Sequence, residues 1–121
     1  MTTILVVDDE FLVADVVTFA LEDEGYHVVR AGNGQKALDV AEREAPDLVI
    51  TDYMMPVMNG LEFASTLRSR LADTMPPIIL MSGAQAHLAR ENGALFAAVF
   101  DKPFKVGDVV GMVRTLIGPP R

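Results

Sequence analysis

The stretch Ile4-Leu5-Val6-Val7-Asp8-Asp9-Glu10 passes directly from four branched apolar residues to three carboxylates. An apolar run without polar alternation predicts a strand that is covered on both faces. Such strands are typical of parallel sheets, which bind ligands at the carboxyl ends of their strands. The three acids stand at such an end. This stretch therefore predicts both the type of sheet and the edge that carries a site.

The same alternation of strand and helix continues along the chain. Apolar runs predict four further strands, at residues 27–31, 48–51, 78–81 and 97–100. Helical spacing and turn residues predict five helices, at about 11–24, 35–44, 61–71, 85–91 and 106–117. In the first helix, positions 12, 13, 16, 17, 20 and 21 are expected to form the buried face. We therefore expect residues 1–121 to form one α/β domain, a doubly wound, five-stranded parallel sheet in a three-layer sandwich.

Composition excludes several other classes of protein. The chain has 121 residues, of which 50% are hydrophobic, and it contains no cysteine, so no disulfide or thiolate site can form. The formal net charge of −7 disfavours direct contact with nucleic acid or an anionic membrane. The longest apolar run, residues 94–100, is far shorter than the roughly 20 residues that span a bilayer. A cytoplasmic location is expected.

Polar side chains at four predicted strand ends should converge on one edge of the sheet, namely Asp8 and Asp9, Asp52, Ser82 and Lys102. Two carboxylates about 4 Å apart repel by roughly 4 kcal/mol at an effective dielectric constant of 20, so such a cluster favours a bound cation. Oxygen ligands suit a hard ion, which predicts Mg²⁺ or, in its place, Mn²⁺.

Carboxylates with a metal, a lysine and a hydroxyl are the groups that phosphoryl transfer requires. The chain has no cysteine, and neither His27 nor His87 ends a strand at this edge, so the predicted nucleophile is the carboxylate of Asp52. Taken alone, an Asp-Asp pair can simply cap a helix, and Lys-Pro can simply form a turn. Four such features at four strand ends favour a phosphoryl-accepting site.

Four motifs resemble those of response-regulator receiver domains in two-component signal transduction. They are Val6-Val7-Asp8-Asp9-Glu10, Asp52-Tyr53-Met54-Met55-Pro56-Val57-Met58-Asn59-Gly60, Met81-Ser82-Gly83 and Lys102-Pro103-Phe104. The resemblance implies the flavodoxin-like strand order 2-1-3-4-5. It also implies a phosphorelay switch, not a conventional enzyme, that promotes its own aspartyl phosphorylation and dephosphorylation. The phosphodonor would be a histidine kinase or a histidine phosphotransfer protein.

The resemblance also implies a role for each matching residue. Asp9 would bind Mg²⁺ directly, Asp8 would assist through water, and the remaining protein ligands would be Asp52 and the backbone carbonyl of Met54. Ser82 and Lys102 would bind the phosphoryl oxygens, with a cis bond before Pro103. The surface of the fourth helix, fifth strand and fifth helix would bind a downstream protein partner or a second copy of the chain.

Two features depart from the family pattern. Val99 stands three residues before Lys102, where the family commonly has an aromatic residue, and Phe100 lies on the opposite face of the strand. Switching is therefore expected to use the loop at residues 82–86 and a short fourth helix. Asp101 should point away from the site. Packing roles are expected for two sets of residues: Met54, Met55, Met58 and Met81, and Phe96, Phe100 and Phe104.

Two other classes of function compete with a phosphoryl-accepting switch. A Mg²⁺-dependent phosphatase with an aspartyl nucleophile would place a second acid two residues later, where this chain has Met54. A flavin or nucleotide binder would have a glycine-rich loop after the first strand, where Asp8-Asp9-Glu10 would repel phosphate in the absence of metal. Both alternatives fit the sequence less well than the switch.

Overall fold

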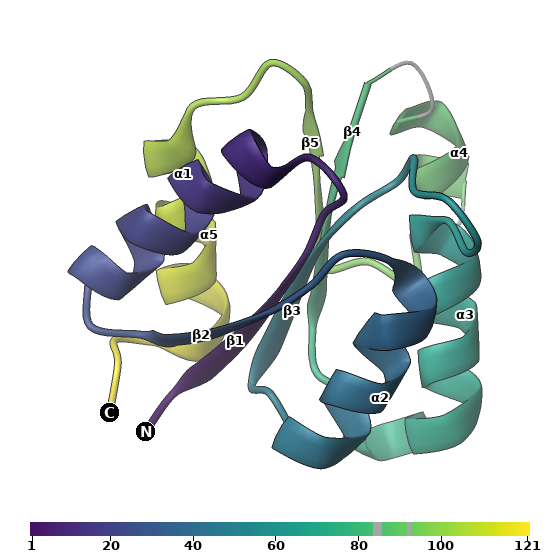
Figure 1. Cartoon of the computed structure of the whole chain (residues 1–121), viewed down its shortest axis with the longest axis horizontal. Coiled ribbons are helices and arrows are strands. Elements are labelled where there is room, and N and C mark those ends of the chain that lie inside the picture. The colour runs from purple at the N-terminus through teal and green to yellow at the C-terminus, as the bar shows by residue number, and fades with distance from the viewer. Residues whose placement is uncertain (84–85, 92) are drawn as a thin grey trace.

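The computed structural model of the chain describes residues 1–83, 86–91 and 93–121. Within them, five strands form one parallel sheet in the order β2-β1-β3-β4-β5, which confirms the flavodoxin-like order (Figure 1). The strands are β1 (Thr3–Val7), β2 (His27–Ala31), β3 (Leu48–Asp52), β4 (Ile78–Ser82) and β5 (Ala98–Asp101).

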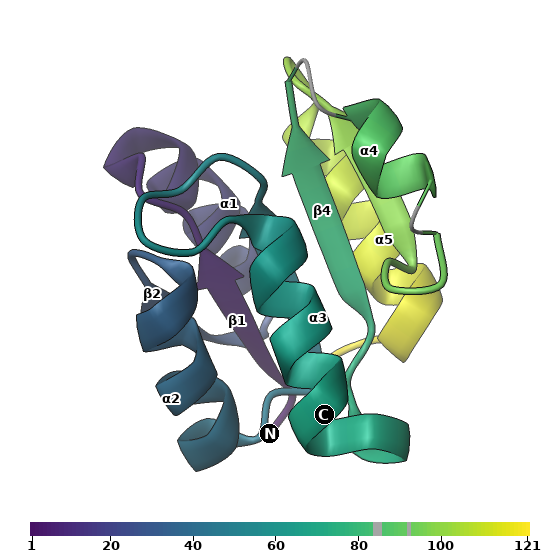
Figure 2. The same cartoon turned by 90° about the vertical axis from the view of Figure 1, so that its right-hand side faces the viewer.

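Helices cover both faces of the sheet and complete the three layers. Helices α1 and α5 lie on one face, and α2, α3 and α4 lie on the other (Figures 1 and 2). In the described residues there are five α-helices and one 3₁₀ helix: α1 (Phe11–Asp23), α2 (Gly34–Glu44), α3 (Gly60–Leu71), η1 (Ala72–Thr74), α4 (Ala86–Glu91) and α5 (Val106–Ile117). None of the helices described is both long and apolar enough to cross a membrane.

The core is divided into two halves because successive strand residues point to opposite faces. On β1, Ile4 and Val6 belong to the half that includes α1 and α5, whereas Leu5 and Val7 belong to the half that includes α2 and α3. The four side chains are fully buried. The unbroken apolar run was therefore a correct indicator of a strand covered on both sides.

The predicted buried face of α1 was partly wrong. The buried residues are Ala14, Val17, Thr18 and Leu21, whereas Leu12 and Val16 are 81% and 54% exposed. Apolar residues occur almost all around this helix, so its apolar surface is wider than the face that the sheet and α5 cover. Periodicity alone could not decide which part of that surface is buried.

The strand boundaries matter for the site. Strands β3 and β4 each run one residue beyond the prediction, so Asp52 and Ser82 are held by the sheet itself. Strand β5 is displaced by one residue from the predicted 97–100, since Ser82 pairs with Asp101. Asp101 is exposed, as expected, and its carboxylate lies 3.1 Å from the Arg90 guanidinium. Helix α4 has six residues and is short, as expected; Gln85, its predicted first residue, lies outside the described residues.

The expected reversal of face between Val99 and Phe100 is confirmed. Val99 packs against the half of the core beside α2 and α3, and Phe100 packs against the half beside α1 and α5. Both are only partly buried, as is Phe104, whereas Phe96 is buried.

The packing role predicted for the four methionines is wrong for Met54. Met55 and Met81 are buried, and Met58 packs against the core, but Met54 is 60% exposed. Met54 lies in the loop between β3 and α3, at the edge of the sheet where the predicted site residues end their strands.

Helix α3 begins directly against the end of β3, at Gly60. The Gly60 amide donates to the carbonyl of Tyr53 at 2.8 Å, and Asn59 and Glu62 close a reciprocal capping box. A Cβ atom at Gly60 would lie 2.4 Å from the carbonyl oxygen of Asp52. The absence of a side chain at Gly60 therefore lets α3 hold the backbone of Asp52 in place.

We predict that Gly60→Ala lowers the free energy of unfolding by about 2–3 kcal/mol, because backbone atoms must move to admit the methyl group. Gly111→Ala is the matched control, since nothing lies within 4 Å of a Cβ atom at this position in α5. It should be neutral or stabilise the protein by about 0.5–1 kcal/mol. Urea unfolding of both variants measures the difference, and equal stabilities would contradict the packing argument.

Candidate functional site

Four carboxylates meet at the carboxyl ends of β1 and β3. One oxygen from each of Asp8, Asp9, Glu10 and Asp52 lies within 4.8 Å of the corresponding oxygens of the other three. The Asp8 and Asp52 side chains are buried, whereas those of Asp9 and Glu10 are exposed. The cluster therefore has an inner pair of carboxylates shielded from solvent, Asp8 and Asp52, and an outer pair exposed to it, Asp9 and Glu10.

Asp8 does not serve as the cap of α1. Its Oδ1 accepts a hydrogen bond from the Glu10 amide at 2.9 Å, while Glu10 occupies the N-cap position of α1 without a side-chain cap bond. The other oxygen, Oδ2, is buried and has no hydrogen-bond partner among the described residues. A buried carboxylate oxygen left in this way calls for a cation or an ordered water. With three further carboxylates beside it, the donor set fits a hard divalent cation.

Lys102 joins β5 to this cluster. Its Nζ lies 2.9 Å from Oδ1 of Asp52 and 3.6 Å from Oε1 of Glu10. The Lys102 amide donates to the carbonyl of Ser82 at 2.8 Å, which holds the start of the side chain at the end of β4. The peptide bond between Lys102 and Pro103 is cis, as the resemblance implied.

Ser82 completes the set of residues that the sequence placed at this edge. It is fully buried and follows Met81, which is the register partner of Asp52 on the neighbouring strand. Its Oγ has no hydrogen-bond partner within the part of the chain that the structure describes. A buried hydroxyl without a protein partner at this edge of the sheet is available to a ligand oxygen.

Burial controls the electrostatics of the carboxylates. Loss of hydration, the largest effect, and the negative charge of Asp52 together outweigh the hydrogen bond from Glu10, so the pKa of Asp8 rises from its usual 3.8 to about 6. Burial also raises the pKa of Asp52, in spite of the hydrogen bond and charge of Lys102. Burial is the largest single influence on Lys102 and would lower its pKa, but the hydrogen bond to Asp52 and the negative charges of Asp52, Asp8 and Glu10 together outweigh it, so the pKa is raised.

Glu10 is the site residue to which sequence reasoning assigned no role. It was noted only as one of the acids that end the first strand. The structure places its carboxylate beside both the acidic cluster and Lys102. A signal was available in the sequence, because Glu10 directly follows Asp9, but contact with a lysine 92 positions later depends on the tertiary fold.

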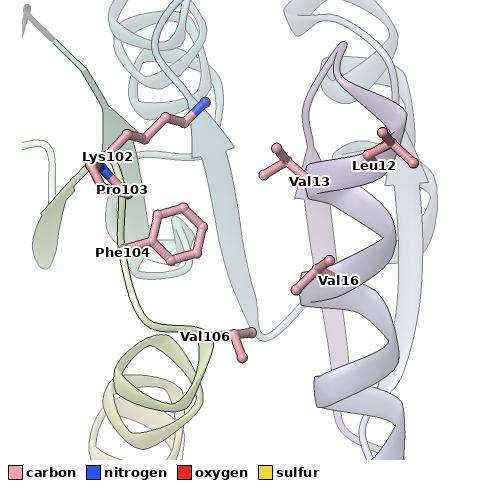
Figure 3. Close-up of a pocket in the computed structure, with 7 residues that line it drawn as sticks. All are labelled: Leu12, Val13, Val16, Lys102, Pro103, Phe104 and Val106. Carbon is pink, nitrogen blue, oxygen red and sulfur yellow. The ribbon is translucent and has the colours of Figure 1, made fainter.

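An apolar groove of about 490 Å³ opens beside Lys102, between α1 and the segment that enters α5 (Figure 3). Leu12, Val13 and Val16 line the α1 side, and Pro103, Phe104 and Val106 line the other. In Figure 3 the Lys102 chain extends away from Val106, with its ammonium at the far end. The start of the Lys102 side chain thus lies beside apolar residues, and its ammonium reaches the acidic cluster.

Comparison with known proteins identifies the family of the chain. A family model, the response regulator receiver domain, matches residues 4–114. The chain is 39% identical over 118 residues to the probable transcriptional regulatory protein TcrX of Mycobacterium tuberculosis, covering 95% of this chain and 49% of TcrX. It is 34% identical over 116 residues to the alkaline phosphatase synthesis transcriptional regulatory protein PhoP of Bacillus subtilis, covering 94% and 48%. The chain thus spans about half the length of these curated relatives.

Solved structures show the same likeness. The response regulator protein TrrA from Thermotoga maritima, crystallised in complex with Mg(2+)-BeF, is 32% identical with a TM-score of 0.83, covering 96% of this chain and 99% of that one. The chemotaxis protein CheY4 of Vibrio cholerae is 28% identical with a TM-score of 0.85, covering 96% and 98%. The chain belongs to the response regulator receiver domain family, whose members are phosphoryl-accepting switches of two-component signalling.

The raised pKa of Asp8 predicts how stability depends on pH. Between pH 3.8 and about 6 the native state binds more protons than the unfolded state, so the contribution of Asp8 to stability is fully present below 3.8 and is lost as the pH rises through 6. At pH 7.5 and with a chelator present, Asp8→Asn should therefore raise the free energy of unfolding by about 1–3 kcal/mol.

The gain should shrink as the pH falls toward 4, and urea unfolding across this range measures it. The exposed Asp39→Asn variant is the control, since it removes one charge from the surface. If the stability gained by Asp8→Asn stayed constant between pH 4 and pH 7.5, the buried charge of Asp8 would not be the cause of the destabilisation.

Proposed function

We propose that Asp52 accepts the phosphoryl group in this receiver domain and that the acidic cluster holds Mg²⁺ beside it. The buried, unpartnered Oδ2 of Asp8 carries the proposal, because this oxygen is open to a cation or its water in a carboxylate cluster that also contains Asp9 and Asp52. Mg²⁺ ligands would be Asp9, Asp52 and the backbone carbonyl of Met54, with Asp8 assisting, and Mn²⁺ could substitute. When bound, Mg²⁺ neutralises charge on the phosphoryl oxygens during transfer.

The chain's own residues position the transfer. A carboxylate oxygen of Asp52 attacks the phosphorus of a phosphohistidine, the P–N bond breaks, and the electron pair returns to the imidazole of the donor. Lys102 is already 2.9 Å from Asp52 and can follow the charge onto the phosphoryl oxygens, while the free Ser82 hydroxyl can donate to one of them. In the reverse modification, water attacks the same phosphorus, the P–O bond to Asp52 breaks, the carboxylate is regenerated and inorganic phosphate leaves. The same groups would promote both steps.

The phosphodonor proposed from the family is a histidine kinase or a histidine phosphotransfer protein. The curated relatives TcrX and PhoP are named as transcriptional regulatory proteins, which supports a place in gene regulation and in the cytoplasm. The net charge of −7 supports action without direct contact to nucleic acid by this part of the chain.

The proposed output surface is formed by α4, β5 and α5, which would bind a downstream partner or a second copy of the chain. It is connected to the site through Ser82, which ends β4, and Lys102, which follows β5. Val99 is a small, partly buried side chain in this region, which supports a shift of the 82–86 loop instead of an aromatic rotation. Residues 84–85 of that loop lie outside the described residues.

We predict that Asp52→Asn keeps the fold, since the side chains are nearly isosteric, but accepts no phosphoryl group from acetyl phosphate with Mg²⁺. Intact-protein mass spectrometry measures the adduct, and peptide mapping locates it in the wild-type chain. Asp101→Asn is the control: its side chain is exposed and paired with Arg90, so labelling should be unchanged. An adduct of undiminished yield on Asp52→Asn would place the acceptor elsewhere. Accumulation of the adduct also separates a switch from a phosphatase or a nucleotide binder.

The metal site makes a separate prediction. Asp9→Ala should weaken Mg²⁺ binding at least about tenfold, because a direct oxygen ligand is lost. It should also abolish the tighter Mg²⁺ binding that beryllofluoride induces in the wild type. Isothermal titration calorimetry measures both effects, and an unchanged affinity in the variant would exclude Asp9 as a ligand.

A further inference from the structure

Lys102 has two carboxylate partners that differ in depth. The inner partner is Asp52, whose side chain is 4% exposed, and the outer partner is Glu10, whose side chain is 60% exposed. The ammonium nitrogen lies 2.9 Å from Oδ1 of Asp52 and 3.6 Å from Oε1 of Glu10. Lys102 is therefore hydrogen-bonded to Asp52, and a small displacement would bring it into hydrogen-bonding distance of Glu10. Among the described residues, these are the ion pairs that Lys102 makes.

The inner pair conflicts with a metal at the same cluster. Asp52 contributes both to the pair with Lys102 and to the set of oxygens that lie within 4.8 Å of one another. A divalent cation held by those oxygens would stand close to the ammonium, and two cations at such a distance repel strongly in a partly buried site. Repulsion between the two cations would therefore weaken the contact between Lys102 and Asp52 when the metal binds.

The structure restricts where the ammonium can go. The Lys102 backbone is tied to β4 through its amide bond to Ser82, and its neighbours Pro103 and Phe104 line the apolar groove beside α1. Movement toward that groove would remove the charge from water and from carboxylates, which is unfavourable. Movement outward brings it to Glu10, whose side chain is exposed. Glu10 belongs to the acidic cluster, but the ligands proposed above are Asp9, Asp52 and the carbonyl of Met54, with Asp8 assisting.

We propose that Glu10 is a positioning residue that receives the Lys102 ammonium when Asp52 binds the metal. The proposal rests on the function proposed above for Asp52 and Mg²⁺. Glu10 then keeps the ammonium of Lys102 at the rim of the site. The ammonium returns inward once the phosphoryl oxygens on Asp52 supply negative charge in place of the Asp52 carboxylate. It raises metal affinity by relieving the repulsion between the two cations, in addition to the direct attraction of one more carboxylate.

A double-mutant cycle on Mg²⁺ affinity separates the two effects of Glu10. Calorimetry is applied to the wild type, Glu10→Gln, Lys102→Gln and the double variant. Glu10→Gln should weaken binding about tenfold in the wild type but only about threefold in the Lys102→Gln background, since the part that acts through the lysine is then absent. An equal factor in both backgrounds would overturn the proposal and leave only direct attraction.

Glu10→Asp provides an independent variant that keeps the charge and shortens the side chain by one methylene. It should bind Mg²⁺ more weakly than the wild type, because direct attraction is retained but contact with Lys102 is lost; wild-type affinity would overturn the proposal. Glu22→Gln, which removes one exposed charge at the far end of α1, should change affinity less than about twofold. Failure of the wild type itself to bind Mg²⁺ would contradict the proposed function instead.

Discussion

The buried pair of carboxylates, Asp8 and Asp52, is the constraint on which the rest of the site depends. Both end strands at the centre of a parallel sheet, where the surrounding side chains exclude water. One ammonium, that of Lys102, reaches Asp52, whereas one oxygen of Asp8 has no protein partner among the described residues. The cluster is therefore electrostatically incomplete, which makes it responsive to a cation and then to a phosphoryl group.

An incomplete site of this kind reduces the stability of the protein in exchange for a function. The raised pKa of Asp8 expresses the free energy of holding a charge without hydration. The fold tolerates it because both halves of the core are filled by fully buried branched side chains along β1, β3 and β4. The close approach of Gly60 to the Asp52 carbonyl shows that the backbone under the site is also fixed by packing.

Beside the site, in β5 and α1, the direction of each side chain decides which half of the core it packs against or whether it faces solvent. Val99 and Phe100 differ by one position, yet they contribute to opposite halves of the core. Helix α1 similarly buries Ala14, Val17 and Leu21, while other apolar residues of the same helix face solvent or the groove beside Lys102. The groove therefore arises from the apolar surface of α1 that neither the sheet nor α5 covers.

The sequence by itself determined the class of fold, the parallel sheet and the edge at which Asp8, Asp52, Ser82 and Lys102 meet. These features follow from local patterns: unbroken apolar runs specify strands covered on both faces, and the residue after each run must stand at the carboxyl end. The strand order came from resemblance to a family, since runs of similar composition do not specify which strands are neighbours.

Only the tertiary structure decided which face of α1 is buried, that Met54 is exposed, and that Glu10 lies beside Lys102. Each of these depends on the packing of elements that are distant in the chain. A helix that is apolar almost all around carries no local mark of the side that a sheet will cover. Likewise, the contact between a residue after β1 and a residue after β5 exists only because β3 and β4 set the distance between those two strand ends.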